Sequence, residues 1–219
     1  MAYNSVVSAS ILTTKLHFPS YRAGLVSRPG LVDRLHAGLS RRLTLISAPA
    51  GYGKTTLISE WIHRIQERSE EDGTTLPEFA WLSLDEEDND PGRFLTYLIA
   101  AMSRSEKHDR SVGIEAFGMA QSPQPESHQA VLTSLINDLA SVRDGTVLVI
   151  DDYHLIDSQA VDSILLFLLE HKPSSLHLVV LTRSDPPLPL ARFRAGNDMT
   201  ELRAADLRFS IAESTIYLN

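Results

Sequence analysis

Several features that would point to a secreted, disulfide-bonded or membrane-spanning protein are missing from this 219-residue sequence. It contains no cysteine, so disulfides and thiolate metal sites are excluded. No apolar run approaches the roughly 18 residues that a membrane-spanning helix needs. The N-terminus has neither the basic start nor the long apolar centre of a signal peptide. We therefore expect a cytoplasmic protein without a membrane partner.

Clusters of basic residues are also missing. The net charge is −8, and residues 66–90 hold ten acidic residues against the single basic Arg68. This segment alone carries a charge of −9, so the rest of the chain is close to neutral. Proteins that bind phosphate backbones concentrate Lys and Arg on one surface. We therefore expect no direct nucleic-acid binding by this chain.

Apolar runs of strand length alternate with longer stretches of helical periodicity. The strand-like runs cover residues 43–48, 79–84, 147–150, 176–181 and 199–203, and the helical patterns cover residues 55–68, 91–104, 126–142 and 159–171. Such alternation predicts βαβ units and a parallel sheet. Because the strand runs are apolar throughout, we expect helices on both faces of the sheet. The predicted fold class is therefore α/β.

The stretch LTLISAPAGYGKTT, residues 43–56, places two glycines and a lysine directly after the first predicted strand. It matches the phosphate-binding pattern G-x-x-x-x-G-K-[ST] except at its first position, which is Ala48. Glycines in such a loop let backbone N–H groups converge on an anion, and the following helix start adds a positive dipole. Candidate nucleotide-binding residues are Ala50, Gly51, Tyr52, Gly53, Lys54, Thr55 and Thr56. The alternative is an ordinary glycine-containing turn before a helix.

A pair of carboxylates ends the third predicted strand in VLVIDDYH, residues 147–154. Ligands of open α/β sheets bind beyond the carboxyl ends of the strands, which would place this pair beside the glycine loop. We expect Asp151 and Thr55 to hold Mg²⁺, and Asp152 to orient an attacking water as a catalytic residue. The alternative is that the two acids cap a following helix.

Two arginines are further candidates. Arg183 ends the fourth predicted strand in LVVLTRSDPP, where it could contact a γ-phosphate, although a surface ion pair is the alternative. Arg28 precedes a predicted amphipathic helix and, with Val26, could cover the base and ribose of a nucleotide. The acidic stretch WLSLDEEDNDPGRF, residues 81–94, is either a solvated helix-capping loop or a sensor of nucleotide or partner. The scattered histidines indicate no metal site beyond Mg²⁺.

The remaining segments define the expected organisation of the chain. Residues 68–78 and 105–127 are polar and turn-rich, so we expect loops there, with the second one mobile. Ser210 and Glu213 fit a capping box that opens a helix, which we interpret as continuing into a longer protein. We therefore expect an N-terminal segment leading into the nucleotide site (1–40), a nucleotide-binding domain (41–209) and the start of a truncated helix towards a missing lid (210–219).

Five stretches together resemble one known family. They are APAGYGKTTLISEW, WLSLDEEDNDPGRFLTYLI, VLVIDDYHLIDS, LTRSDPPLPLARFRA and LRAADLRF. They resemble the nucleotide-binding domain of MalT-like, LuxR-type transcriptional activators, which belong to the STAND class of P-loop ATPases. The resemblance covers about residues 11–218. It implies a three-layer P-loop NTPase fold with a parallel five-stranded sheet in the order 5-1-4-3-2.

The resemblance also implies roles for individual residues. Lys54 and Thr55 match the Walker A positions of that family, and Asp151 and Asp152 match the Walker B positions. Arg183 matches the strand-end sensor arginine, and Arg28 matches an N-terminal arginine that approaches the nucleotide. The implied ligands are ATP or ADP with Mg²⁺. Lys54, Asp152 and Arg183 would support slow ATP hydrolysis.

Family members are switches that rest with ADP and self-associate with ATP, and they continue into a lid, a sensor domain and a DNA-binding helix-turn-helix. We therefore expect a regulatory weak ATPase whose partners include the remainder of such a regulator, with a monomeric chain here and ATP-dependent self-association of the whole. Without the lid, nucleotide should bind more weakly. The alternative function is a kinase-like phosphotransferase acting on a small acceptor.

Overall fold

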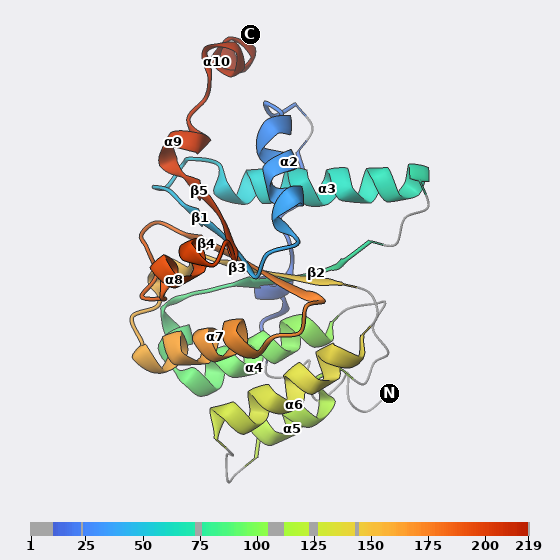
Figure 1. The fold of residues 1–219 in the computed structure, drawn as a ribbon, viewed down its shortest axis with the longest axis vertical. Helices are drawn as coiled ribbons and strands as arrows, with labels where there is room; N and C mark the ends of the chain where they lie inside the picture. The colour runs from blue at the N-terminus through green and yellow to red at the C-terminus, as the bar shows by residue number, and fades with distance from the viewer. Residues whose placement is uncertain are drawn as a thin grey trace.

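A computed structural model describes residues 11–22, 24–72, 76–104, 112–122, 127–142 and 145–218. Its centre is a five-stranded sheet (Figure 1). The strands are β1 (Leu43–Ser47), β2 (Glu78–Ser83), β3 (Thr146–Asp151), β4 (Leu176–Thr182) and β5 (Met199–Arg203). All neighbouring strands pair in parallel in the order β2-β3-β4-β1-β5. Read from the other edge this is 5-1-4-3-2, so the predicted topology is confirmed.

The connections between strands are mostly helical. The α-helices are α2 (Pro29–Gly38), α3 (Lys54–Asp72), α4 (Pro91–Ser103), α5 (Ile114–Ala120), α6 (His128–Ser141), α7 (Gln159–His171), α8 (Leu190–Ala195), α9 (Ala204–Leu207) and α10 (Ile211–Leu218). Three short 3-10 helices, η1 (Thr13–Leu16), η2 (Glu86–Asn89) and η3 (Tyr153–Leu155), complete the described elements.

The helices form a layer on each face of the sheet (Figure 1). Helices α2 and α3 cover one face, where Trp61 and Leu35 pack on Ile46 and Val149. Helices α4 to α7 lie on the other face. Because both faces are covered, β1, β3 and β4 are buried at every position, which explains why the sequence shows apolar runs instead of alternation.

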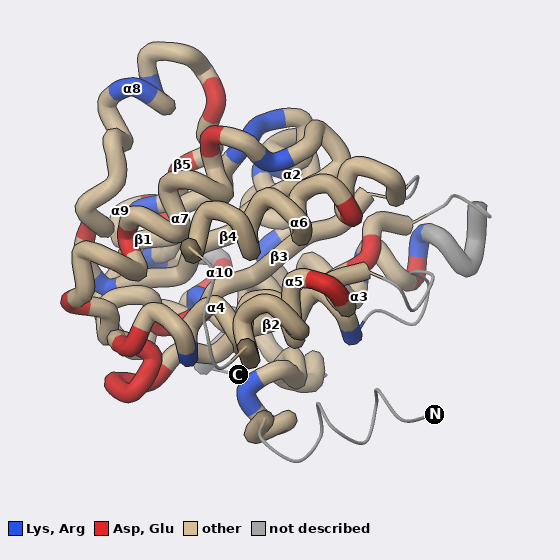
Figure 2. The backbone as a smooth tube through the Cα atoms, turned by 90° about the horizontal axis from the view of Figure 1, so that it is seen from below, with Lys and Arg blue, Asp and Glu red and all other residues tan. Residues whose placement is uncertain are grey.

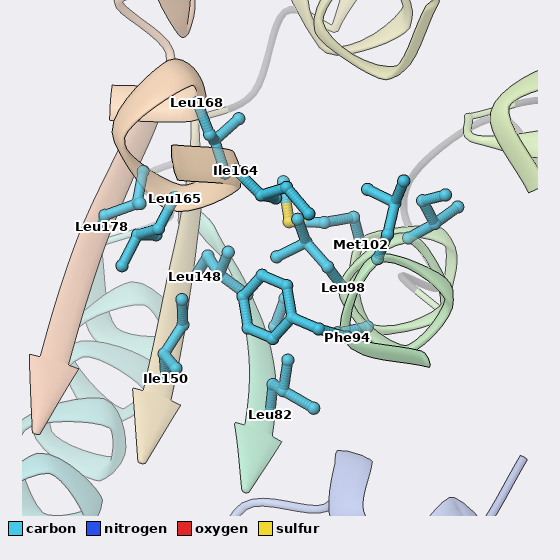
Figure 3. Packing of buried hydrophobic residues seen from close by; sticks show 14 of the residues in the cluster. Leu82, Phe94, Leu98, Met102, Leu148, Ile150, Ile164, Leu165, Leu168 and Leu178 are labelled. Atoms are coloured by element: carbon cyan, nitrogen blue, oxygen red, sulfur yellow. The ribbon is translucent and has the colours of Figure 1, made fainter. Parts of the chain in front are cut away.

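Figure 3 shows the packing on the second face. Phe94 and Leu98 of α4 meet Leu165 of α7 above Leu148 and Ile150 of the sheet, and all five side chains are buried. Both helices present apolar residues at intervals of three and four, so each directs one continuous stripe into the core. This packing holds β3, which ends at the paired acids, rigidly between its neighbours.

The strand register brings the candidate residues to one edge of the sheet. Ser47 at the end of β1 is paired with Thr182 at the end of β4. Ser83 at the end of β2 is paired with Asp151 at the end of β3. The segments that follow β1, β3 and β4 therefore emerge side by side at the carboxyl edge, as the sequence predicted.

The predicted loop at 105–127 is wrong in part, because residues 114–120 form helix α5. This helix begins after Gly113, which has a φ of 78°, and buries Ala116 and Phe117 against the core. Its seven residues are too few for helical periodicity to emerge from the sequence, and tertiary packing supplies its stability. Residues 105–111 and 123–126 lie outside the described residues, as does part of the predicted 68–78 loop.

Charged positions are spread over the molecule (Figure 2). Lys and Arg positions are scattered among several elements, including α2 and α8, and do not gather on one face of the described chain. None of the helices in the described ranges combines the length and the apolar character that crossing a bilayer requires.

Candidate functional site

The phosphate loop, residues 48–55, connects the end of β1 to the start of α3. Its left-handed positions are Gly51, with a φ of 82°, and Gly53, with a φ of 75°. A Cβ added at either glycine would meet nothing within 4 Å, so the backbone conformation, and not lack of space, requires glycine. Ala48 is not among the positive-φ residues and is buried. This explains why alanine can occupy the first position of the pattern.

Lys54 is the first residue of α3, and its side chain turns back over the loop. The ammonium Nζ donates hydrogen bonds to the carbonyl oxygens of Ala48 at 2.8 Å and Pro49 at 3.2 Å. Burial lowers the pKa of Lys54, while Asp151 and Asp152 oppose this effect by their negative charge. The lysine, the glycine loop and the paired acids therefore form one electrostatic unit, as the sequence predicted.

Thr55 and Asp151 meet directly although 96 positions separate them in the chain. The Thr55 hydroxyl donates to Asp151 Oδ2 at 3.0 Å. Burial, and next to it the charge of Asp152, raises the pKa of the Asp151 carboxyl. The Asp151 carboxylate and the Thr55 hydroxyl supply two oxygen ligands. A hard divalent cation bound there would offset the cost of burying the negative charge. These two residues therefore fit the predicted Mg²⁺ site.

The turn after β3 exposes the second acid. Asp152 adopts a left-handed conformation, with a φ of 59°, and its backbone N–H donates to Asp151 Oδ1 at 2.8 Å. Its carboxylate is 44% exposed and lies 3.7 Å from Nδ1 of His154. Burial lowers the pKa of His154, and the charge of Arg183 adds to that effect. The histidine is therefore a neutral polar group beside Asp152.

Arg183 follows the end of β4 on the same sheet edge and is exposed. It has no hydrogen-bond or ion-pair partner within the described ranges of the chain. Its charge nevertheless lowers the pKa of both Lys54 and His154, which places the guanidinium within electrostatic reach of the phosphate loop and the η3 turn. The surface ion pair considered as the alternative is not formed with any described residue.

A cavity of about 700 Å³ opens beside the phosphate loop. Three separate segments line it: the stretch before α2, the glycine loop with the first turn of α3, and the end of α9. The lining residues are Leu25, Val26, Arg28, Gly51, Tyr52, Gly53, Thr56, Leu57, Glu60, Leu207, Arg208 and Phe209. Val26, Tyr52 and Thr56, which the sequence marked as candidates for nucleotide contact, therefore line one cavity.

The Arg28 side chain is directed towards the C-terminal segment. Its guanidinium donates to the backbone carbonyls of Leu207 and Arg208, at 2.6 and 2.8 Å, and pairs with Glu213 at 3.0 Å. Arg28 lines the cavity, but its guanidinium binds the connection between α9 and α10, residues 208–210, which we call the hinge. The capping box predicted from Ser210 and Glu213 is present, with hydrogen bonds of 2.7 and 3.2 Å.

The sequence alone did not identify two residues of the site, Glu60 and His154. Glu60 of α3 is 4% exposed and accepts hydrogen bonds from the Ser27 hydroxyl, at 2.7 Å, and from the Arg28 N–H, at 3.1 Å. It thereby fixes the segment before α2 against the phosphate-loop helix. A lone acid within the apolar stretch LISEWI was the available signal. His154 was visible in DDYH, but only the fold places it beside Asp152. No group of three or more His, Cys, Asp or Glu side chains placed to hold a metal ion occurs among the described residues.

Comparisons with known proteins agree with this geometry. A family model described as the AAA ATPase domain matches residues 30–181. The chain is 36% identical over 204 residues to the HTH-type transcriptional regulator MalT of Yersinia enterocolitica, covering 93% of this chain and 21% of that protein. It is 31% identical over 208 residues to MalT of Vibrio cholerae, covering 95% and 22%. The chain therefore spans about a fifth of the length of these relatives.

Two solved structures share the fold. One describes Drosophila ORC bound to DNA, with a TM-score of 0.54, 13% identity and coverage of 99% of this chain and 53% of that one. The other describes the Aeropyrum pernix ORC1 protein in complex with DNA, with a TM-score of 0.52, 18% identity and coverage of 80% and 44%. At these identities the likeness concerns the fold alone.

Proposed function

The chain belongs to the AAA ATPase domain family, and we propose that it is an ATP- and ADP-binding switch domain that hydrolyses ATP slowly. The observation that carries the proposal is the meeting of Thr55 and Asp151 beside a glycine loop whose lysine faces the same edge. The loop, Lys54 and Thr55 are neighbours in the chain, whereas Asp151 lies 96 positions away from Thr55. A glycine turn without a nucleotide function would not require them to converge.

Nucleotide binding follows from the shape of the site. The N–H groups of the phosphate loop and the Lys54 ammonium would hold the β- and γ-phosphates, with Lys54 exchanging its two carbonyl partners for phosphate oxygens. The cavity is of the size that small ligands occupy, and Val26 and Phe209 give it apolar walls for a base. Thr55 and Asp151 would hold Mg²⁺, which supplies charge neutralisation at the phosphates.

Hydrolysis would depend on groups around the η3 turn. The exposed Asp152 carboxylate can orient a water molecule and accept its proton, and Nδ1 of His154 lies 3.7 Å from it. Arg183 supplies a positive charge without a competing partner among the described residues, which suits contact with the γ-phosphate. An additional cation from another molecule can accelerate such reactions about 10³–10⁵-fold, so we expect this chain alone to be slow.

A regulatory role is supported by the similarity to MalT proteins, which are transcription regulators more than four times the length of this chain. We propose that exchange of ADP for ATP changes the contacts of Leu207–Phe209 in the cavity wall and thereby the position of α10. From α10 the change would reach the sensor and DNA-binding parts of a longer regulator in the cytoplasm. Arg28 would mediate this step, because it binds the α9 end and Glu213 together.

The test is isothermal titration calorimetry of the chain with ATP and with ADP, each with Mg²⁺. We expect Lys54→Ala to lose at least 100-fold in affinity for both nucleotides, because the loop loses its charge-assisted contacts. Arg183→Ala should lose about 10-fold for ATP and almost nothing for ADP, which lacks the γ-phosphate.

The matched control is Arg192→Ala. Arg192 is 64% exposed and pairs only with Glu170 among charged residues of the described chain, so both affinities should stay unchanged. If the folded wild-type chain binds neither nucleotide, the proposed function is wrong for this chain. If Arg183→Ala weakens ATP and ADP equally, Arg183 does not distinguish the two nucleotides.

A further inference from the structure

The acidic stretch 85–90 has no part in the proposed chemistry, yet it is built into the fold beside the site. Helix η2 follows β2 at the carboxyl edge, next to the end of β3. Asp88 is fully buried, at 0% exposure, and it accepts hydrogen bonds from Lys15 and from Arg93 Nε, the latter at 3.2 Å. Lys15 is itself only 6% exposed. Asp88 and Lys15 therefore form a buried ion pair that anchors this segment, while Glu86, Glu87 and Asp90 are exposed.

Further contacts make this segment rigid. Asp85 caps η2 and pairs with Lys15 at 2.9 Å, while the Lys15 ammonium lies 4.5 Å from the centre of the Tyr97 ring. Asp90 caps α4 by accepting from the Arg93 N–H at 2.7 Å. The 3-10 helix η2 is thus held by Lys15 of η1 and by the start of α4.

Asn89 connects this segment to the turn that carries Asp152 and His154. Its Nδ2 donates to the carbonyl of Leu155 at 3.0 Å and to that of Glu86 at 2.9 Å, and its Oδ1 accepts from the N–H of Asp157 at 2.6 Å. One side-chain amide therefore binds both the last residue of η3 and the residue two positions beyond it.

Within the η3 turn, the N–H groups of Leu155 and Ile156 donate to the carbonyls of Asp152 and Tyr153, at 3.0 and 3.1 Å. At its start the Asp152 N–H bonds to Asp151 Oδ1 at 2.8 Å, and from below the Tyr153 hydroxyl donates to Asp162 at 2.7 Å. Asn89 is the side chain that holds its far end among the described residues. Asp152 has a left-handed backbone, which persists only where surrounding contacts impose it.

We propose that Asn89 is a positioning residue for ATP hydrolysis. By fixing the backbone at Leu155 and Asp157, its amide sets the direction of the Asp152 carboxylate and the His154 ring without touching nucleotide. This inference rests on the proposed function. A displacement of about 1 Å in a catalytic group can cost on the order of 100-fold in rate, so a single restraint on the turn is enough to matter.

The test combines Asn89→Ala with three measurements on the chain. Calorimetry should show ATP and ADP affinities within about twofold of wild type, because the Asn89 amide is occupied by backbone groups of Glu86, Leu155 and Asp157. Single-turnover ATP hydrolysis should fall about 10-fold. Hydrogen exchange at the Asp157 amide, followed by NMR without nucleotide, should become faster because that N–H loses its acceptor.

Two further variants make the result specific. Asn89→Asp keeps an acceptor for Asp157 but places a carboxylate oxygen against the carbonyls of Glu86 and Leu155, so its hydrolysis rate should fall at least as far as that of Asn89→Ala while its Asp157 exchange stays closer to wild type. Arg192→Ala removes a surface ion pair with Glu170 that involves neither η2 nor η3, so its hydrolysis and its Asp157 exchange should match wild type. If Asn89→Ala does not fold, Asn89→Asp decides the question.

The outcomes separate this inference from the proposed function. If wild type binds no nucleotide or does not hydrolyse ATP, the proposed function fails and the role of Asn89 fails with it. Should wild type hydrolyse ATP and Asn89→Ala do so at the same rate, only the positioning role is overturned. A parallel loss of affinity and rate would also overturn it, because the residue would then support binding.

Discussion

His177 of β4 is a buried histidine, 3% exposed, whose ring lies between Thr44 and Arg41. Its Nδ1 lies 2.9 Å from the Arg41 carbonyl and must donate to it, so the neutral ring accepts from the Thr44 hydroxyl through Nε2. Burial lowers the pKa of His177 to about 4. The unfolded chain has an ordinary histidine pKa near 6.5, so between these values only the unfolded state gains the proton.

Stability should therefore fall as the pH falls from about 6.5 to about 4. This one group would contribute a loss on the order of 3 kcal/mol. The measurement is urea unfolding at pH 7 and pH 5 for wild type and His177→Gln, whose amide does not titrate. The difference between the two chains should shrink at pH 5. An unchanged difference would show that His177 is protonated equally in both states.

Asp151 gives the opposite dependence. Because burial raises its pKa in the folded chain, its stabilising contribution is complete below the unfolded pKa and is lost as the pH rises through the folded value. At pH 7 the buried carboxylate therefore lowers the free energy of unfolding. Asp151→Asn should raise the free energy of unfolding by about 1 kcal/mol, measured by urea unfolding without nucleotide or metal.

The same substitution should abolish the effect of Mg²⁺ on ATP affinity, because it removes the anionic oxygen that would hold the cation. Calorimetry with Mg²⁺ and with EDTA measures this effect. An Asp151→Asn chain that keeps its Mg²⁺ dependence would contradict the assignment of Asp151 as a metal ligand, and one that is less stable than wild type would contradict the cost of burying its carboxylate.

The η1–η2–α4 junction depends on the buried pair of Lys15 and Asp88. Lys15→Met would leave Asp88 without its shortest ion-pair contact, facing only the half-buried Arg93. Removing one partner of a buried pair typically costs about 3–5 kcal/mol, and we expect the lower end because Arg93 remains. Thermal unfolding of Lys15→Met and of the double variant with Asp88→Asn tests this. The double variant should lose less, since no buried charge is left uncompensated.

The elements themselves were largely predictable. Helix α7 has the predicted ends, 159 and 171, because four apolar residues at helical spacing define its buried stripe. Helix α3 extends to Asp72, beyond the predicted end at 68, since residues 69–72 carry no apolar residue and give no periodic signal. Helix α5 and the 3-10 helices were missed because they are too short for periodicity and depend on packing.

For the molecule as a whole, the charge distribution decides which partners can bind. The net charge is −8, and basic positions are dispersed over the described surface (Figure 2). We expect no retention of duplex DNA at 50 mM salt by about 10 µM chain, a concentration at which basic proteins bind DNA non-specifically. A mobility-shift assay with a basic protein as positive control measures this. Salt-dependent binding by this chain would contradict the expectation.

The overall arrangement also sets the place from which a longer protein would continue. Helix α10 stands apart from the layered body in Figure 1, and the hinge before it is bound by Arg28. The fold therefore joins the cavity beside the phosphate loop to α10 through the contacts of Arg28. This connection is the structural basis of the switch role that we propose.

Local chemistry in the sequence determined the α/β class, the phosphate loop with its lysine, and the pair of acids at a strand end. The strand order was implied only by the family resemblance. These features persist because each depends on neighbouring residues: apolar runs, glycines at positive φ and acids at a strand end. Only the tertiary structure decided that the Arg28 guanidinium binds the α9–α10 hinge, that Glu60 fixes the entry segment, and that Asn89 holds the η3 turn. Those contacts join residues far apart in the chain, and their partners are set by packing, which no local pattern encodes.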